Sequence, residues 1–279
     1  IKISNDVKRI MSSLKIKKDN PIYLDRIIEF CQFFNVGYKE LNKIIAQFGV
    51  PDQPSFRENI FKDFDKIKET EIKTSYEKIA KLYTLRLLMR FERINDIYEF
   101  EQILESNKHK NVVLDYGCGT SDLGLIAASK GCDVTICDLY DEKFEFAKWR
   151  FQRNSLNVNT IPIKNLMKLP ELEENSFDII LVADVMKQVI NPREYLKLFY
   201  NALRPGGLLF CNQGTPQNKN FSNAVENRFG PWSIGGQLNS SLSTNYLSDY
   251  ETYFLKHFRR FDESIYGQFW WSSKKHFTS

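Results

Sequence analysis

The sequence predicts an α/β fold, in which a doubly wound, mostly parallel β-sheet follows a helical domain. From residue 107 onward, short β-branched and apolar runs alternate with helical patterns, which is typical of parallel sheets. One such run, residues 112–114, passes through a glycine-containing turn directly into a helix. Residues 1–106 contain helical patterns only. We therefore expect an N-terminal helical cap domain over residues 1–106 and a second domain over residues 107–279.

Four helices are expected in the N-terminal domain. The first begins with proline at its first helical position, Pro21, where the missing N–H costs nothing. The second covers residues 38–48 and is closed by Gly49. Residues 55–58 form a capping-box pattern that opens the third helix. A longer apolar stripe predicts one continuous helix over residues 75–105.

The most informative stretch is the turn after residues 112–114. There the chain reaches Gly117 and Gly119, where the backbone can take positive φ and approach a ligand closely. Thr120 or Ser121 can cap the helix that follows. Because the first N–H groups of a helix have no partner within it, a strand, glycine turn and helix in this order predict a cradle for a ligand.

A carboxylate after the next predicted strand indicates what the ligand carries. Residues 133–137 form that strand and end at Asp138, which can accept hydrogen bonds from both hydroxyls of a ribose. A nicotinamide dinucleotide would also fit this feature. However, Asp122 occupies the place of the third glycine in the dinucleotide pattern, and the carboxylate of Asp115 is out of place beside a pyrophosphate.

The stretch resembles motif I of the class I methyltransferases, which use S-adenosylmethionine. The family pattern D-x-G-C-G-x-G is matched by Asp115, Gly117, Cys118 and Gly119, and Asp138 falls where the family keeps its ribose-binding acid. Residues 177–184 look like the fourth strand of that fold, and residues 203–210 are similar to its L-x-P-G-G turn entering the fifth strand.

The resemblance implies a seven-stranded sheet closed by a C-terminal hairpin, here residues 257–274, and S-adenosylmethionine as cofactor. It places the following residues at the cofactor: Asp115, Gly117, Cys118, Gly119, Ser121, Asp138, Leu139, Asn165, Leu166 and Asp184. Two residues depart from the family pattern. Ser121 replaces the usual third glycine, and Gln188 stands where a histidine commonly follows the fourth strand. These departures leave open a non-catalytic partner protein with the same fold.

The acceptor is expected to be a small polar molecule, methylated at oxygen or nitrogen. A base is needed only if that acceptor is a hydroxyl or a protonated amine, and the candidates are Asp184, Glu226 and His257. A long irregular insertion, residues 214–248, is expected to roof the carboxyl edge of the sheet together with the N-terminal helices. Both segments would shape the acceptor pocket.

Composition narrows the classes of partner. The net charge is only +4, with both signs interspersed, so nucleic acid and anionic membrane are not expected partners. The five cysteines have no metal-binding spacing, which indicates free thiols in a reducing cytoplasm and no metal site. No apolar run reaches the ~20 residues of a membrane span. The missing initial Met indicates a trimmed or partial chain, and nothing in the sequence indicates an oligomeric state.

Overall fold

The computed structural model describes residues 21–49, 51, 54–61, 72–89, 93–165, 168–186, 189, 192–211, 252–260 and 270–275. The chain divides into two compact units. One comprises Ile1–Asp96 with Tyr140–Asn154, and the other comprises Ile97–Leu139 with Ser155–Ser279. The domain boundary drawn from the sequence, between residues 106 and 107, stays a prediction.

The first unit is helical. It contains α2 (Pro21–Phe33), α3 (Tyr38–Phe48), α4 (Pro54–Phe61), α5 (Ile72–Leu88) and α8 (Glu142–Arg153). As expected, α2 has Pro21 as its first residue, and α3 ends at Gly49, whose N–H bonds the carbonyl of Ile45. The core of the unit is made by apolar side chains that include Ile27, Phe30, Leu41, Phe56, Leu85, Leu88 and Phe146.

Two expectations about these helices were wrong. The capping box would place Ser55 just before the third helix, but α4 begins at Pro54 and contains Ser55 as its second residue, because proline suits the first helical position. The single helix over residues 75–105 is two helices, since α5 ends at Leu88 and α6 (Arg93–Ser106) begins after a break. Leu88 packs in the core of the helical unit, whereas α6 from Ile97 onward belongs to the other unit.

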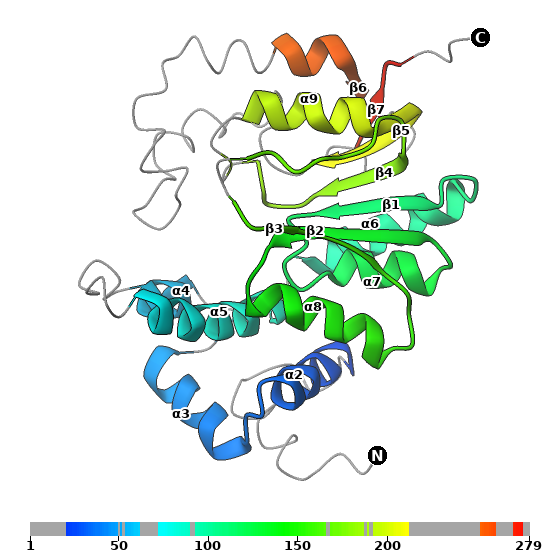
Figure 1. Ribbon diagram of the computed structural model, residues 1–279. Helices are drawn as coiled ribbons and strands as arrows, with labels where there is room; N and C mark the ends of the chain where they lie inside the picture. Colours follow the sequence, from blue (N-terminus) through cyan, green and yellow to red (C-terminus); the bar gives the residue numbers. More distant parts are fainter. Residues whose placement is uncertain are drawn as a thin grey trace. The chain divides into compact units, whose positions relative to one another are not determined.

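The second unit contains the predicted sheet (Figure 1). Its seven strands are β1 (Val112–Tyr116), β2 (Asp133–Leu139), β3 (Asn159–Ile163), β4 (Phe177–Val182), β5 (Leu203–Cys211), β6 (Phe258–Arg260) and β7 (Trp270–Ser273), in the order β3-β2-β1-β4-β5-β7-β6. The first five strands pair in parallel, and β7 runs antiparallel to both β5 and β6. The predicted mostly parallel seven-stranded sheet and its closing antiparallel pair are therefore confirmed.

Helices of the second unit cover both faces of this sheet. On one face, α9 (Pro192–Ala202) packs its buried Leu196 and Phe199 into a cluster with Leu114 and Ile180 of the strands (Figure 1). On the other face lies α7 (Asp122–Ser129), which contacts β1 and β2. Because side chains alternate along a strand, each central strand supplies apolar residues to both faces, and β4 is buried along its whole length.

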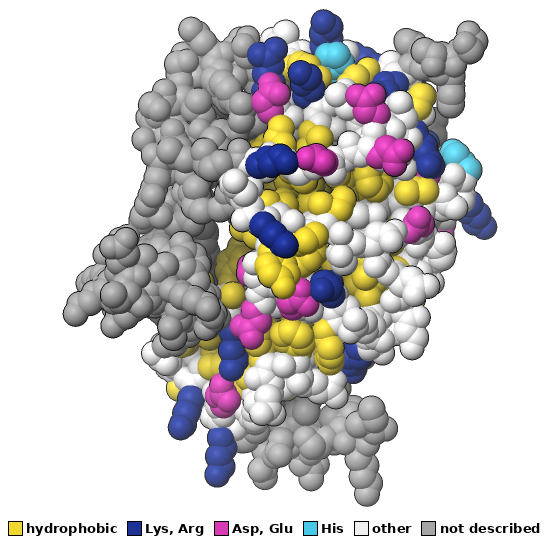
Figure 2. Space-filling model, viewed as in Figure 1, with side chains coloured by type: hydrophobic (Ala, Val, Ile, Leu, Met, Phe, Trp, Pro, Cys, Tyr) yellow, Lys and Arg dark blue, Asp and Glu magenta, His cyan; other side chains and the backbone are white. Residues whose placement is uncertain are grey.

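The surface carries charges of both signs. In the face shown in Figure 2, Lys and Arg side chains are interspersed with Asp and Glu and do not gather by sign. Among the described residues, no helix is both long and apolar enough to cross a membrane.

Candidate functional site

The sheet register brings three acidic residues to one edge. Tyr116 at the end of β1 pairs with Cys137, so Asp138 of β2 lies beside the turn that follows β1. On the other side of β1, Asp115 pairs with Leu181 of β4, three positions before Asp184. The carboxyl ends of parallel strands therefore place Asp115, Asp138 and Asp184 at the same edge, where open α/β folds bind their ligands.

In the turn between β1 and α7, residues 117–121, every second residue has a positive φ angle. Gly117, Gly119 and Ser121 have φ angles of 64°, 58° and 53°, in the left-handed region. At Gly117 a side chain is also excluded by space, since a Cβ there would collide with the side chain of Val185, which follows Asp184. Glycine is thus required at this position for two independent reasons, and the turn lies directly against the segment that leaves β4.

Asp115 fixes one end of the turn. Its Oδ2 accepts a hydrogen bond of 2.7 Å from the hydroxyl of Ser121 and one of 3.2 Å from the N–H of Gly124 in the first turn of α7. The carboxyl is 4% exposed. The expectation that Ser121 caps α7 with its own side chain was wrong, because Ser121 occupies the cap position without a capping bond and a carboxylate from the strand accepts from the helix instead.

Asp138 fixes the other side of the turn. Its Oδ2 accepts a hydrogen bond of 2.7 Å from the N–H of Gly119, and its Oδ1 accepts one of 2.7 Å from the N–H of Leu139. A carboxylate oxygen has two lone pairs and can accept more than one hydrogen bond, which suits it to ribose hydroxyls. A tight glycine turn beside an acceptor of this kind fits the adenosyl part of S-adenosylmethionine.

Several other expected site residues lie along the same edge. Asp184 is 7% exposed and has a φ of 61°, a conformation that costs a non-glycine residue free energy and often occurs at functional sites. Leu139 is 36% exposed at the end of β2. Asn165 is exposed and follows β3, which pairs with β2 up to Leu139. Leu166, Gln188, Glu226 and the 214–248 insertion lie outside the described residues.

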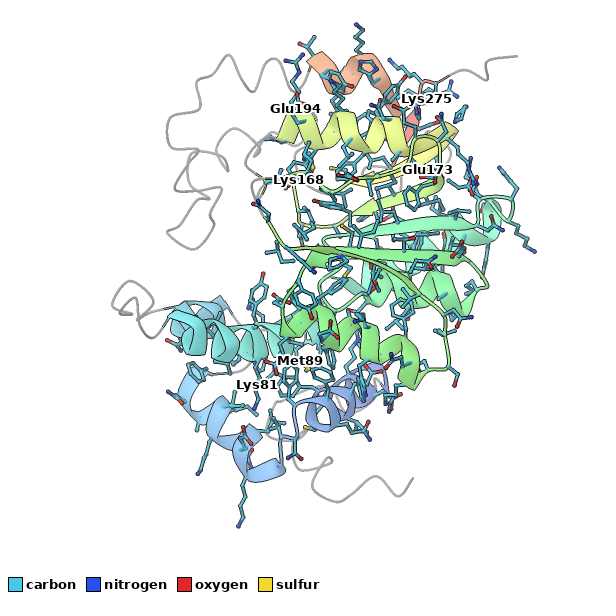
Figure 3. All side chains as sticks on the ribbon, viewed as in Figure 1. Lys81, Met89, Lys168, Glu173, Glu194 and Lys275 are labelled. Carbon is cyan, nitrogen blue, oxygen red and sulfur yellow. The ribbon has the colours of Figure 1, made fainter. Side chains whose placement is uncertain are left out.

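The structure does not bring His257 to this edge. The N–H of Lys274 bonds the carbonyl of His257, and β7 runs antiparallel to β5 with Ser272 paired to Leu208, so Lys274 lies further toward the start of β5. Lys275, labelled in Figure 3, donates from its Nζ to the carbonyl of Leu203, where β5 begins. His257 therefore lies at the amino edge of the sheet, and the expectation that it serves as the base was wrong.

The ring of His257 has a structural environment. It lies 4.2 Å from the ring of Tyr253 and 4.5 Å from the ring of Tyr200, and these contacts join the short helix before β6, residues 252–257, to α9. Burial, and then the charges of Lys256 and Lys274, lower the pKa of His257. This histidine packs the closing strands against α9.

Sequence reasoning missed a pair of tyrosines beneath the turn. Tyr116, between Asp115 and Gly117, is 3% exposed, and its ring meets that of Tyr195 at 5.8 Å. Their hydroxyls are hydrogen-bonded, and burial is the first cause that raises the pKa of each phenol. Both therefore stay protonated at neutral pH. The sequence indicated this pair only through Tyr116, a bulky residue at the variable position between Asp115 and Gly117.

Comparison with known families agrees with this geometry. The family model described as "Methyltransferase domain" matches residues 107–251, which is more than half of the chain. The chain therefore belongs to this methyltransferase family, as the resemblance of its motifs implied, and its cofactor is S-adenosylmethionine.

The individual relatives are more distant. Ubiquinone biosynthesis O-methyltransferase of Coxiella burnetii is 32% identical over 126 residues, which are 44% of this chain and 50% of that protein. Demethylmenaquinone methyltransferase of Listeria welshimeri is 26% identical over 157 residues, 55% of this chain and 61% of that protein. The chain thus spans only about half of the length of these relatives. A solved S-adenosylmethionine-dependent methyltransferase from Clostridium acetobutylicum is 24% identical with a TM-score of 0.39, over 48% of this chain and 56% of that one.

Proposed function

We propose that this chain transfers a methyl group from S-adenosylmethionine to an oxygen or nitrogen of a small polar molecule. The observation that carries the proposal is the glycine turn held between two buried carboxylates, with Asp115 on the side of α7 and Asp138 on the side of β2. This arrangement offers a close backbone approach and a ribose acceptor at one edge of the sheet.

Each expected cofactor residue has a role that its position supports. Asp138 would accept from the ribose hydroxyls. Gly117 and Gly119, with Cys118 between them, would let the cofactor lie directly on the backbone. Leu139 at the end of β2 and Asn165 after β3 would surround the adenine, and the same role for Leu166 stays a prediction from the sequence. Asp115 and Ser121 would hold the shape of the turn, and Asp184 would face the cofactor or the acceptor from the end of β4.

The chemistry asks little of these residues. The cofactor supplies an electrophilic methyl group on a positively charged sulfur. The protein must hold the acceptor atom in line with it, and proximity of this kind accounts for a large part of the rate. A hydroxyl or protonated amine would also need a base. Asp184 is our candidate for that base in the described part of the chain, and Glu226 stays a prediction.

The names of the relatives support a small-molecule acceptor but do not identify it. The names of the two proteins compared above refer to ubiquinone and demethylmenaquinone. The first is an O-methyltransferase, so an oxygen acceptor is the first to test. The proposal that the N-terminal helices and residues 214–248 shape the acceptor pocket stays a prediction.

The cofactor assignment is tested by calorimetric titration of S-adenosylmethionine. Asp138→Ala removes a charged acceptor worth about 1.5–3 kcal/mol, so affinity should fall by ~10- to 150-fold. Gly119→Val should abolish binding, because a branched side chain is both strained at positive φ and placed in the path of the ligand. Asp133→Ala, at the exposed start of β2, is the matched control and should leave the affinity for S-adenosylmethionine unchanged. Unchanged affinity in both site variants would refute the assignment, and tight binding of a nicotinamide dinucleotide would favour an oxidoreductase.

A further inference from the structure

Ser121 adopts a backbone conformation that suits glycine. Its φ and ψ are 53° and 44°, in the left-handed region, and its side chain is fully buried. For an L-amino acid this region brings Cβ close to the carbonyl oxygen and costs free energy. Because a glycine would take the same conformation without that cost, the serine side chain must contribute something that offsets it.

The contribution is a short hydrogen bond inside the protein. The Ser121 hydroxyl donates to Oδ2 of Asp115 at 2.7 Å, and the two residues are 0% and 4% exposed. A hydroxyl that donates to a carboxylate makes a charge-assisted bond, which is stronger than a bond between neutral groups. The same oxygen accepts from the N–H of Gly124 at 3.2 Å. One oxygen atom thus joins the end of β1 to the cap position and the first turn of α7.

This arrangement differs from an ordinary helix cap, and the chain contains one for comparison. Asp141 precedes α8 with an extended backbone at a φ of −140°, and its side chain accepts from the N–H of Phe144 at 2.9 Å. Ser121 has neither feature. Its backbone is left-handed, and its hydroxyl donates a hydrogen bond instead of accepting one. Its hydroxyl acts on Asp115, and Asp115 accepts from the helix.

We propose that Ser121 is a positioning residue that shapes the cofactor turn before the cofactor binds. The Ser121–Asp115 bond ties the end of the turn to β1, and the bond from Gly119 to Asp138 ties its middle to β2. A turn held on both sides loses less conformational freedom when a ligand orders it, so the tether increases cofactor affinity. This inference rests on the proposed function, since it requires that the turn binds S-adenosylmethionine.

A purely structural role for Ser121 predicts a different result. If the hydroxyl only stabilised α7, its removal would lower the melting temperature and leave cofactor affinity unchanged at temperatures where the protein is folded. The positioning role requires that affinity falls, and that it falls through Asp115. A double-mutant cycle on the two residues separates these cases.

The experiment titrates S-adenosylhomocysteine, the demethylated cofactor, into the full chain by calorimetry. Ser121→Ala removes the bond and keeps the strained backbone, so the dissociation constant should rise ~10-fold or more. Ser121→Gly removes the bond and relieves the strain, so its loss should be smaller. In the Asp115→Asn background, Ser121→Ala should add little further loss.

The control is Ser129→Ala at the other end of α7, where an exposed hydroxyl donates to the carbonyl of Ile126 at 2.8 Å. Its affinity should equal that of the wild type. A folded Ser121→Ala variant with wild-type affinity would overturn this inference but not the proposed function. Fully additive losses of affinity for Ser121→Ala and Asp115→Asn would do the same. A wild-type chain that does not bind S-adenosylhomocysteine would overturn the proposed function as well. If Ser121→Ala does not fold, the cycle is run with Ser121→Gly, and additivity there would count equally against the tether.

Discussion

A buried ion pair fastens α8 to α2 within the helical unit. Oε2 of Glu29 accepts from Nε of Arg150 at 2.8 Å, and its Oε1 accepts from Arg153 at 3.3 Å. The side chains of Glu29 and Arg150 are each 6% exposed, whereas Arg153 is 28% exposed. Glu29→Ala would therefore leave the Arg150 guanidinium buried without its carboxylate, which costs about 3–5 kcal/mol in comparable cases. Because Arg153 can turn to water, we expect a loss near the lower end of this range.

The same unit supplies a matched surface pair. Lys81 and Glu40 lie 2.9 Å apart, but their side chains are 25% and 50% exposed. Exposed pairs contribute about 0–1 kcal/mol, so Glu40→Ala should be close to neutral. The two substitutions each remove one carboxylate from an ion pair of similar length. Burial is thus the main difference that the comparison measures.

Unfolding in urea, followed by circular dichroism, gives the free energies. With a slope of ~1–3 kcal/mol per molar urea, a loss of 3 kcal/mol shifts the midpoint by ~1–3 M, which is easily resolved. Replacing both partners, as Glu29→Leu with Arg150→Met, should recover part of the loss, because apolar substitutes remove the buried charge. Equal and small shifts for Glu29→Ala and Glu40→Ala would refute the reasoning that burial makes this pair important.

Two further predictions follow from shifted pKa values. Burial, and then the charge of Glu40, raise the pKa of the Cys31 thiol to about 11. Alkylation of Cys31 by iodoacetamide at pH 8 should thus be ~10-fold slower or more than that of a free cysteine, measured by peptide mass spectrometry, and an equal rate would contradict the cause given. The pKa of His257 is lowered, so the unfolded chain binds this proton more readily than the folded one. The contribution of His257 to stability is fully present at pH values above its unfolded-state pKa of about 6.5 and is lost as the pH falls below that value. His257→Gln should therefore flatten the decline in the free energy of unfolding between about pH 7 and pH 5. An unchanged slope would show that His257 does not titrate as described.

The sequence could bring the residues of the candidate cofactor site together because they are close along the chain. Asp115, Gly117, Gly119 and Ser121 lie within one turn, and Asp138 ends the next strand. The rule that parallel strands place their carboxyl ends at one edge is enough to bring them together. What the sequence did not reveal was the direction of the bonds. Ser121 has the residue type of a helix cap, but in the structure its backbone is left-handed and its hydroxyl donates to Asp115.

Features that depend on packing between distant segments were less predictable. The sequence made His257 one of three candidate bases, yet the edge to which it belongs follows from the antiparallel pairing of β7 with β5. The break between α5 and α6 has the same origin. No glycine or proline occurs in residues 86–97, and apolar residues continue through them. Leu88 packs in the core of the helical unit, whereas Ile97 belongs to the other unit.

α8 is encoded within the methyltransferase segment but packs in the helical unit. The helix lies within the family match, yet its Phe146 and Trp149 rings pack 5.2 Å and 5.6 Å from the ring of Phe33 in α2. A second set of its side chains, Phe144 and Phe151 among them, is also buried. The sequence shows that apolar residues are spread around the whole circumference of α8. A helix with this pattern is buried on more than one side. The helices before residue 97 supply one of those covers. They bury Phe146 and pack against Trp149 of a helix that the methyltransferase segment itself encodes, and their removal would expose these two rings to water.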